Sequence, residues 1–432
     1  MMTWEFPPFI AGGLGTACYG LARALLCKGI EIDLMLPTAY PAIFPLRNPD
    51  DVDSLQARPL SAEVIFPETF SEQTLATRLM WLGLSYESGA YGFSNRRLHH
   101  HMSERFHHLT SHTSPSDLLQ VLIQSLQGDE LLFKQVLAFT QMVYAHVAEN
   151  DYDLIHAHDW LTYPAALLLQ SRSHCPVIAH IHATEFDRAA GPGDHRIHEI
   201  EYAGLTLANR VISVSQYTKQ MIVNRYAVDP NKVETVHNAY SMDEEEKKKH
   251  RIFKDPVVLF MGRITLQKGP DYFLKIAERV IKQFPRVRFL MAGTGDMFSR
   301  ILQQGASLRL KDRFLCLGFL GREEVKRLLD ATDIYVMPSV SEPFGIAPLE
   351  AMASGAVAII SKHAGAAEIL ENVYKVDFWD IERTSDIILE LLHHPSRRAA
   401  LAKAGEHEVA DIQWNEAADK IIQVYERVAC ST

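Results

Sequence analysis

Two acidic residues close together in the chain, Glu342 and Glu350, have the side chains best suited to bind a polyhydroxylated molecule. Glu342 lies in the segment Ser341-Glu342-Pro343-Phe344-Gly345, and Glu350 follows shortly after it. A carboxylate accepts hydrogen bonds from neighbouring hydroxyl groups, such as those of a sugar or a ribose. An acid that merely favours a helix N-terminus is the simpler interpretation of either residue alone, but the whole segment favours a ligand site.

The residues between these glutamates predict the start of a helix. Pro348 is tolerated in a helix only in the first turn, so we expect a helix from near Gly345 that stops at Gly355. The backbone amides of Phe344, Gly345 and Ile346 would then precede the helix and be free to bind a phosphate.

Two cations follow a short apolar run in the second half of the chain. Arg263 and Lys268 lie in Gly262-Arg263-Ile264-Thr265-Leu266-Gln267-Lys268-Gly269, directly after Val257–Met261. Fixed cations at the carboxyl end of a strand can neutralise a diphosphate and stabilise it as a leaving group. An isolated pair of this kind would be two solvated loop cations, but its place at the end of a strand favours a diphosphate site.

The first half of the chain offers a glycine-rich turn and two polar strand ends. Gly12 and Gly13 open a helix, where glycine lets the backbone approach a phosphate. His156-Ala157-His158-Asp159-Trp160 ends one expected strand, and His180-Ile181-His182 ends the next. We expect His158, Asp159 and His182 to contact sugar hydroxyls, and His156 and His180 to pack in the interior. No Cys or carboxylate set completes a recognisable metal pattern with these histidines, so no metal site is predicted.

The elements that must position these residues alternate regularly after residue 254. Short apolar runs separated by helical segments indicate a parallel sheet covered on both faces, whose ligands bind at the carboxyl ends of the strands. The expected strands are Val257–Met261, Val287–Ala292, Phe314–Leu320, Asp333–Met337 and Ala356–Ile360, with helices at Asp271–Gln283 and Glu323–Ala331.

The first half repeats this pattern less regularly. A helix is expected up to Gly29, followed by strands at Ile32–Leu36, Leu154–His156, Val177–His180 and Val211–Val214. Met1–Trp4 leaves room for only a short strand before the glycine turn, unless the natural start lies upstream. Residues 41–115 form an expected insertion whose histidine-rich stretch, His99 to His112, is interpreted as a solvated loop. Opposed charge blocks at 243–250 indicate a solvated linker.

The composition excludes several classes of protein. A formal net charge of −10 over 432 residues is not that of a general nucleic-acid binder. The five cysteines are scattered, which favours a reducing, cytoplasmic compartment. No apolar run is long enough for a transmembrane helix, so no stable membrane insertion is expected. The glycine turn lacks the spacing and the acidic residue of a dinucleotide site, which argues against an NAD-dependent dehydrogenase.

Together these motifs resemble the retaining glycosyltransferases that include glycogen synthases and sucrose synthases. The most specific part is the pattern from Glu342 to Glu350, supported by the Arg263/Lys268 loop, the Gly12-Gly13-Leu14 turn and His158-Asp159-Trp160. The resemblance implies the GT-B fold: an α/β protein of two Rossmann-like doubly wound domains facing one another across a cleft. It implies an acceptor-side domain at 1–240, a nucleotide-sugar domain at 250–412, and a C-terminal helix at 413–432 that packs back on the first domain.

The same resemblance implies roles for individual residues. Glu342 would contact the donor sugar and Glu350 the ribose, while Arg263 and Lys268 hold the diphosphate. His182 would sit near the sugar, and the backbone at Gly12 and Gly13 would close on the phosphates. Ile10 stands where starch synthases carry a lysine, which leaves more of the phosphate charge to Arg263 and Lys268.

The activity expected is retaining transfer of a hexosyl group, with glucose favoured, from UDP- or ADP-glucose to an α-glucan, without a metal or other cofactor. Transfer to a small-molecule or lipid acceptor by a family 4 enzyme stays open, as does a catalytically silent sugar-binding protein. The sequence leaves the donor base, the acceptor and the oligomeric state undetermined.

Overall fold

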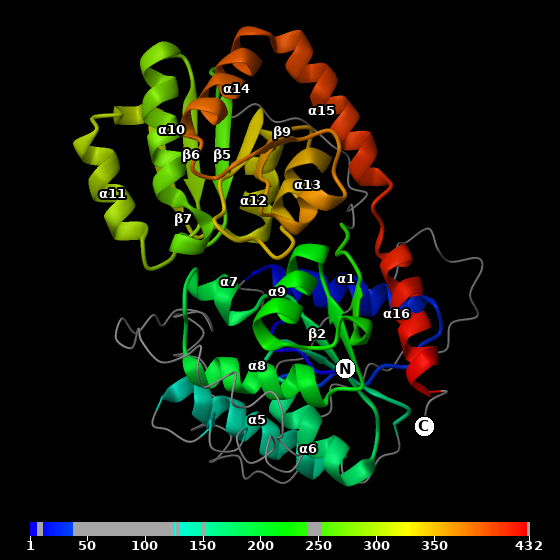
Figure 1. The fold of residues 1–432 in the computed structure, drawn as a ribbon. Coiled ribbons are helices and arrows are strands. Elements are labelled where there is room, and N and C mark those ends of the chain that lie inside the picture. The colour runs from blue at the N-terminus through cyan, green and yellow to red at the C-terminus, as the bar shows by residue number, and fades with distance from the viewer. Residues whose placement is uncertain are drawn as a thin grey trace.

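The computed structural model describes residues 1–6, 12–37, 122, 125–126, 130–147, 152–240 and 253–429. They form two α/β domains stacked one above the other, and the chain ends in a helix that returns from the second domain to the first (Figure 1). The predicted insertion at about 41–115, with its histidine-rich stretch, and the predicted linker at 243–250 lie outside the described residues.

The second domain contains a six-stranded parallel sheet. Its order is β10-β9-β8-β5-β6-β7. The strands β5, β6 and β7 follow one another toward one edge of the sheet, and β8, β9 and β10 follow one another from β5 toward the other edge. The four inner strands of the sheet are almost wholly buried because helices cover both faces, whereas the two edge strands are partly exposed. The strands are β5 (Val257–Met261), β6 (Arg288–Ala292), β7 (Phe314–Gly318), β8 (Ile334–Met337), β9 (Val357–Ser361) and β10 (Tyr374–Val376). The order reverses between β5 and β8, and open α/β sheets bind ligands at such a reversal.

The helices of this domain lie close to the predicted segments. They are α10 (Pro270–Gln283), α11 (Phe298–Ser307), α12 (Arg322–Asp330), α13 (Ala347–Ala353), α14 (Ile381–His393) and α15 (Pro395–Ala410). The prediction of a helix that starts near Gly345 is confirmed: α13 begins at Ala347, and Gly345 itself stays outside the helix because its φ is +95°. Pro348 lies in the first turn of α13, as expected.

The first domain contains a four-stranded parallel sheet of order β1-β2-β3-β4. Its strands are β1 (Ile155–His158), β2 (Val177–Ile181), β3 (Arg210–Ser213) and β4 (Val233–Thr235). Met2 forms single bridges to Met35 and to Ala157, which places the first residues beside β1. The predicted strand at Ile32–Leu36 is wrong, because only Met35 pairs and the Met1–Thr3 segment beside it is too short for a ladder.

Helices cover this smaller sheet as well. They are α1 (Gly13–Cys27), α5 (Leu131–Val147), α6 (Tyr163–Ser173), α7 (Glu185–Ala189), α8 (His195–Leu207) and α9 (Gln216–Tyr226). None of the helices in the described part of the chain is both long and apolar enough to cross a membrane.

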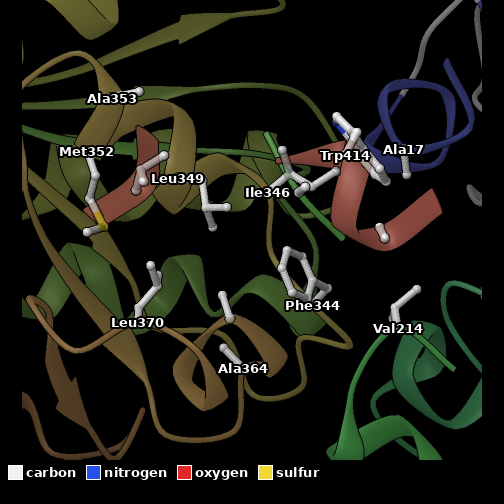
Figure 2. Close-up of a cluster of buried hydrophobic side chains, with 14 of the residues drawn as sticks. Ala17, Val214, Phe344, Ile346, Leu349, Met352, Ala353, Ala364, Leu370 and Trp414 are labelled. Atoms are coloured by element: carbon white, nitrogen blue, oxygen red, sulfur yellow. The ribbon is translucent and has the colours of Figure 1, made fainter. Parts of the chain in front are cut away.

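One hydrophobic cluster joins the two domains. It contains Ala17 of α1 and Val214 after β3, together with Phe344 and Leu349 of the second domain (Figure 2). Trp414, the first residue of α16 (Trp414–Ala429), lies in the same cluster beside Ala17. The final helix therefore packs against α1, although it follows the second domain in the chain (Figure 1).

Candidate active site

Glu342 and Lys268 lie side by side where the strand order of the second domain reverses. Glu342 follows β8, and Lys268 ends the short turn η3 (Leu266–Lys268) that follows β5. The Lys268 ammonium group donates to Oε2 of Glu342, which also accepts from Oγ of Ser339 at 3.2 Å. The carboxylate is buried, at 5% exposure, and Lys268 is only half-buried. The structure thus brings together two of the residues that the sequence predicted for the donor site.

The loop that carries Glu342 is held by backbone hydrogen bonds to the next loop. The amide of Glu342 donates to the carbonyl of His363 at 3.2 Å, and the amide of Gly365 donates to the carbonyl of Glu342 at 2.9 Å. On the other side, Gly269 has φ of +69°, and a Cβ there would lie 2.1 Å from the carbonyl oxygen of Pro338. Glycine is therefore required at 269 for η3 to lie against this loop.

Arg263 is held at the same edge of the sheet. Its Nη2 donates to Oε1 of the buried Gln267 at 3.2 Å. The loop after β6 packs directly on this segment: a Cβ at Gly293 would lie 1.9 Å from the carbonyl oxygen of Gly262, and one at Gly295 would lie 2.4 Å from that of Ile264. The two predicted cations, Arg263 and Lys268, are therefore carried by one tightly packed loop.

Glu350 is a half-buried carboxylate on α13. Its side chain makes no hydrogen bond or ion pair with another described residue. Burial raises the pKa of this carboxyl group to about 7. Hydroxyl groups of a ligand would supply the hydrogen bonds that the ionised carboxylate lacks.

Between the two glutamates, the side chains of residues 344 and 346 pack in the core, which leaves only the backbone to bind a ligand. The side chains of Phe344 and Ile346 are buried, at 3% and 7% exposure, and belong to the cluster that joins the domains (Figure 2). Any contact of residues 344–346 with a phosphate would have to come from the backbone around Gly345.

The glycine turn of the first domain is held by the segment that begins the chain. Gly12 is the N-cap of α1 and Gly13 its first residue, and a Cβ at Gly13 would meet no atom within 4 Å. The amide of Gly12 donates to Oε2 of the buried Glu5 at 3.1 Å. A phosphate bound there would have to replace Glu5 as the hydrogen-bond acceptor of this amide. No feature of the sequence indicated this contact between Glu5 and Gly12.

Four histidines form a stack at the ends of β1 and β2. His158 and His182 share a hydrogen bond between Nδ1 and Nε2 at 2.9 Å, and His156 and His180 share one at 3.2 Å. Burial lowers the pKa of His182 to about 3 and the pKa values of the other three well below the usual range, so all four rings are neutral near pH 7. His156 and His180 are buried at 2% exposure, in agreement with the interior position expected of them.

Asp159 holds the loop that carries His182. It accepts a hydrogen bond from the amide of His182 at 2.6 Å, and burial raises its pKa to about 6. Asp159 and His158 are almost fully buried, at 1% and 0% exposure. Their predicted contact with sugar hydroxyls stays a prediction, and in this structure both support His182.

The two domains meet through polar contacts that sequence reasoning missed. Oγ of Ser341, the neighbour of Glu342, donates to Oδ1 of Asp187 on α7 at 2.5 Å. Oγ of Ser215 donates to the carbonyl of Pro343 at 2.6 Å. The spacing of Thr184 and Asp187 is that of a capping box, which the structure contains, but a capping box gives no sign of a contact with the other domain.

Glu368 makes a second set of contacts between the domains. It accepts from the amides of Gln216 and Tyr217 at 2.8 and 2.7 Å, at the N-terminus of α9, and Nε2 of His237 lies 2.7 Å from it. The first domain is therefore held against the loops that carry Glu342 and Glu368 in the second domain.

Two groups of described side chains have the spacing of metal ligands. One contains Cys18, His158 and His182, and the other contains His156, His158 and His180; within each, the ligand atoms lie within 4.8 Å of one another. The prediction that no recognisable ligand set exists missed Cys18, because α1 brings it to the histidines from far away in the sequence.

Two family models match adjacent parts of the chain. Residues 94–244 match the model for Glycosyltransferase Family 4, and residues 242–408 match the model for Glycosyl transferases group 1. The chain is a glycosyltransferase. The two matched regions meet at residues 242–244, which lie in the sequence between β4 of the first domain and β5 of the second.

Full-length and partial relatives agree with this assignment. An uncharacterised glycosyltransferase of Methanocaldococcus jannaschii is 25% identical, over 98% of this chain and 97% of the relative. A D-inositol 3-phosphate glycosyltransferase of Mycolicibacterium smegmatis is 28% identical over 68% and 72% of the two chains. A glycogen synthase of Mycobacterium tuberculosis is 22% identical over 98% and 93%.

Solved structures of similar fold confirm the GT-B architecture. The sucrose-phosphate synthase of Thermosynechococcus elongatus superposes with a TM-score of 0.68 at 19% identity, covering 100% of this chain and 98% of the other. Anabaena HepE in complex with UDP and glucose superposes with a TM-score of 0.57 at 18% identity, over 68% and 82% of the two chains. The glycosyltransferase therefore has the two Rossmann-like domains predicted from its motifs.

Proposed function

We propose that this glycosyltransferase transfers glucose, with retention of configuration, from a nucleotide diphosphate glucose to the end of an α-glucan. The observation that carries the proposal is the ion pair between the buried Glu342 and the half-buried Lys268, with Arg263 nearby, where the sheet order reverses. These groups match a sugar attached to a diphosphate: a carboxylate for hydroxyl groups and two cations for phosphates. The glucan acceptor is supported by the glycogen synthase relative, which aligns over nearly the whole chain.

Donor binding would rearrange the Lys268–Glu342 pair. A diphosphate is a stronger partner for the Lys268 ammonium group than one carboxylate, so Lys268 would turn toward the phosphates together with Arg263. Oε2 of Glu342 would then be free to accept hydrogen bonds from the sugar hydroxyls. Glu350 would bind the ribose, since its side chain has no partner among the described residues.

The proposed chemical step is substitution on the face from which the leaving group departs. The acceptor hydroxyl oxygen forms the new bond to C1 of the sugar while the bond from C1 to the phosphate oxygen breaks. The departing diphosphate takes the proton of the acceptor hydroxyl, and Arg263 and Lys268 stabilise its negative charge. His182 is neutral, so it would act as a hydrogen-bonding group beside the sugar and not as an acid.

In this proposal the two cations neutralise the leaving group without a metal ion or other cofactor. Activity that survives dialysis against a chelator would agree with it, and activity that returns only on addition of a divalent cation would contradict it.

The free cysteines Cys18, Cys27, Cys175 and Cys316 support a reducing, cytoplasmic location as part of the same proposal.

The test is incubation of the purified protein with UDP-glucose or ADP-glucose, each with and without glycogen. We expect release of the nucleotide diphosphate and growth of the glucan, with an α-linkage visible by NMR. A β-linked product would contradict retention. The absence of both transfer and donor hydrolysis with every donor would contradict the activity.

A second acceptor class is favoured by other comparisons. The D-inositol 3-phosphate glycosyltransferase relative and the sucrose-phosphate synthase structure carry names that point to small phosphorylated molecules. A panel of sugar phosphates and inositol phosphate, assayed beside glycogen with the same donor, separates the two. Transfer to the small acceptors alone would replace the glucan in this proposal.

A further inference from the structure

The candidate residue His182 belongs to a set of three side chains that could bind a metal ion. Cys18 comes from α1, His158 from the end of β1, and His182 from the loop after β2. One ligand atom from each lies within 4.8 Å of the other two. Cys18 and His158 are fully buried, and His182 is half-buried.

The imidazole rings of this set have unused nitrogen atoms. His158 Nδ1 and His182 Nε2 bind each other, but His158 Nε2 and His182 Nδ1 are buried without a hydrogen-bond partner among the described residues. Leaving a buried polar atom without a partner is unfavourable, and a bound metal ion would supply that partner. By contrast, His156 uses both ring nitrogens, with Tyr425 at 2.6 Å and His180 at 3.2 Å.

We propose that Cys18, His158 and His182 bind a transition-metal ion of the Zn²⁺ class, and that the bound ion inhibits sugar transfer. A thiolate and two imidazoles form a donor set that Zn²⁺ and Co²⁺ prefer, and three protein ligands leave the fourth position to water. Metal–ligand bonds of about 2.0–2.3 Å place tetrahedral ligand atoms about 3.4–3.8 Å apart. Since the ligand atoms here lie within 4.8 Å of one another, no two of them need to approach by more than roughly 1.4 Å.

Binding changes the protonation of the site. The S–H bond of Cys18 breaks, the proton leaves to solvent, and the sulfur–metal bond forms in its place. The oxidation state of sulfur and metal does not change. Since binding releases a proton, the affinity for the metal rises with pH.

Inhibition follows from the place of His182. A ring held by a metal ion cannot keep its position beside the donor sugar, so the metal and a productive donor compete for His182. This consequence rests on the proposed function, whereas the binding of the metal does not.

The test of binding is a titration of the full-length, reduced protein with Co²⁺, followed by absorption. The wild type is expected to show a thiolate-to-cobalt charge-transfer band in the near ultraviolet together with the visible bands of tetrahedral Co²⁺. Cys18→Ser is expected to lose the charge-transfer band. His182→Ala is expected to weaken binding more than about 100-fold, since even the outer partners of metal ligands contribute about 10- to 100-fold.

A matched control lies on the same helix. Cys27 is exposed at the end of α1, and Cys27→Ser is expected to keep the wild-type spectrum. The histidine stretch from His99 to His112 has no cysteine, so Co²⁺ bound there gives no thiolate band. Circular dichroism confirms that each variant is folded. No thiolate band in the wild type, or a band that persists in Cys18→Ser, would overturn the site.

The inhibitory role is measured separately with Zn²⁺ in the transfer assay. We expect Zn²⁺ to inhibit the wild type and Cys27→Ser, and to inhibit Cys18→Ser at least about 100-fold less strongly, while Cys18→Ser keeps its activity without Zn²⁺. Equal inhibition of Cys18→Ser would overturn this role. If no transfer is found with any donor, the proposed function fails while the Co²⁺ spectra still decide the metal site.

Discussion

At the scale of single residues, the candidate site contains two acids in different states. Glu342 is paired with Lys268, whereas Glu350 has no partner among the described residues and burial raises its pKa to about 7. The difference arises because the loop after β5 reaches one carboxylate and not the other. The two acids are therefore expected to respond differently to substitution and to pH.

Glu342→Gln is expected to lower kcat/KM by about 100- to 1,000-fold, the size of effect seen when one group that stabilises a transition state is lost. The amide keeps the shape of the side chain but not its charge, and it leaves Lys268 without its anion. The measurement is initial-rate kinetics with the donor varied. Glu323→Gln, an exposed residue on α12, is the control and should match the wild type. Unchanged kinetics in Glu342→Gln would favour a silent sugar-binding protein.

The pH dependence of donor binding is expected to follow Glu350. Its carboxyl group is mostly protonated below about pH 6 and mostly ionised above about pH 8, since its pKa is about 7. If the ionised form accepts the ribose hydroxyls, the KM for the donor falls as pH rises through this window. Glu350→Gln should show a KM about 10- to 100-fold above the wild type at pH 8, because hydrogen bonds to a charged group contribute about 1.5–3 kcal/mol.

The profile of KM against pH in Glu350→Gln distinguishes this explanation from others. Glu350→Gln should lose the fall in KM near pH 7, and Glu323→Gln should keep it. A fall that persists in Glu350→Gln would assign the titration to another group.

At the scale of elements, helix α16 completes the first domain although it follows the second. Trp414 packs over Gly20 of α1, and Tyr425 binds Nδ1 of His156 at 2.6 Å. A Cβ at Gly20 would lie 2.2 Å from Nε1 of Trp414. Glycine at position 20 is thus required for the helix contact and not for backbone conformation.

Gly20→Ala is expected to lower the free energy of unfolding by about 1–3 kcal/mol, the usual cost of forcing an extra methyl group into a packed core. Urea unfolding followed by tryptophan fluorescence measures it. Gly13→Ala is the matched control on the same helix, because a Cβ there meets no atom within 4 Å. Equal effects of the two substitutions would contradict the packing of Trp414 on α1.

At the scale of the whole molecule, the two domains are joined by a hydrophobic cluster and by a few polar contacts near the candidate site. Ser341 binds Asp187, and Glu368 binds the first amides of α9. Both contacts adjoin the loop of Glu342, since the amide of Gly365 in the turn that carries Glu368 donates to the Glu342 carbonyl. Closure of the domains and assembly of the donor site are therefore expected to be linked.

Glu368→Ala is expected to shift the protein toward a more open arrangement of its domains. Loss of the contacts with Gln216, Tyr217 and His237 should raise the donor KM roughly 5- to 30-fold, which corresponds to about 1–2 kcal/mol. Small-angle X-ray scattering should show a larger radius of gyration for the variant. Glu371→Ala, an exposed neighbour, should change neither quantity. An unchanged radius together with an unchanged KM would show that Glu368 does not stabilise the closed arrangement.

The sequence by itself determined the architecture of the second domain and brought its candidate site residues to one edge of the sheet. Strands and helices there follow from local hydrophobic periodicity, and the carboxyl ends of parallel strands must share one edge of the sheet. The order of the residues along the chain was therefore enough to place Arg263, Lys268 and Glu342 together at that edge. The sequence predicted the start of α13 near Gly345 but not its first residue, because the left-handed conformation of Gly345 depends on the loops around it.

The tertiary structure alone decided what surrounds these residues. Cys18, His158 and His182 come together from separate elements, as do Ser341 with Asp187 and Tyr425 with His156. No local pattern encodes such contacts, because each depends on how two domains and a returning helix are packed against one another. Periodicity specifies an element and the face it buries, whereas the partner of a buried polar side chain is specified only when the elements are assembled.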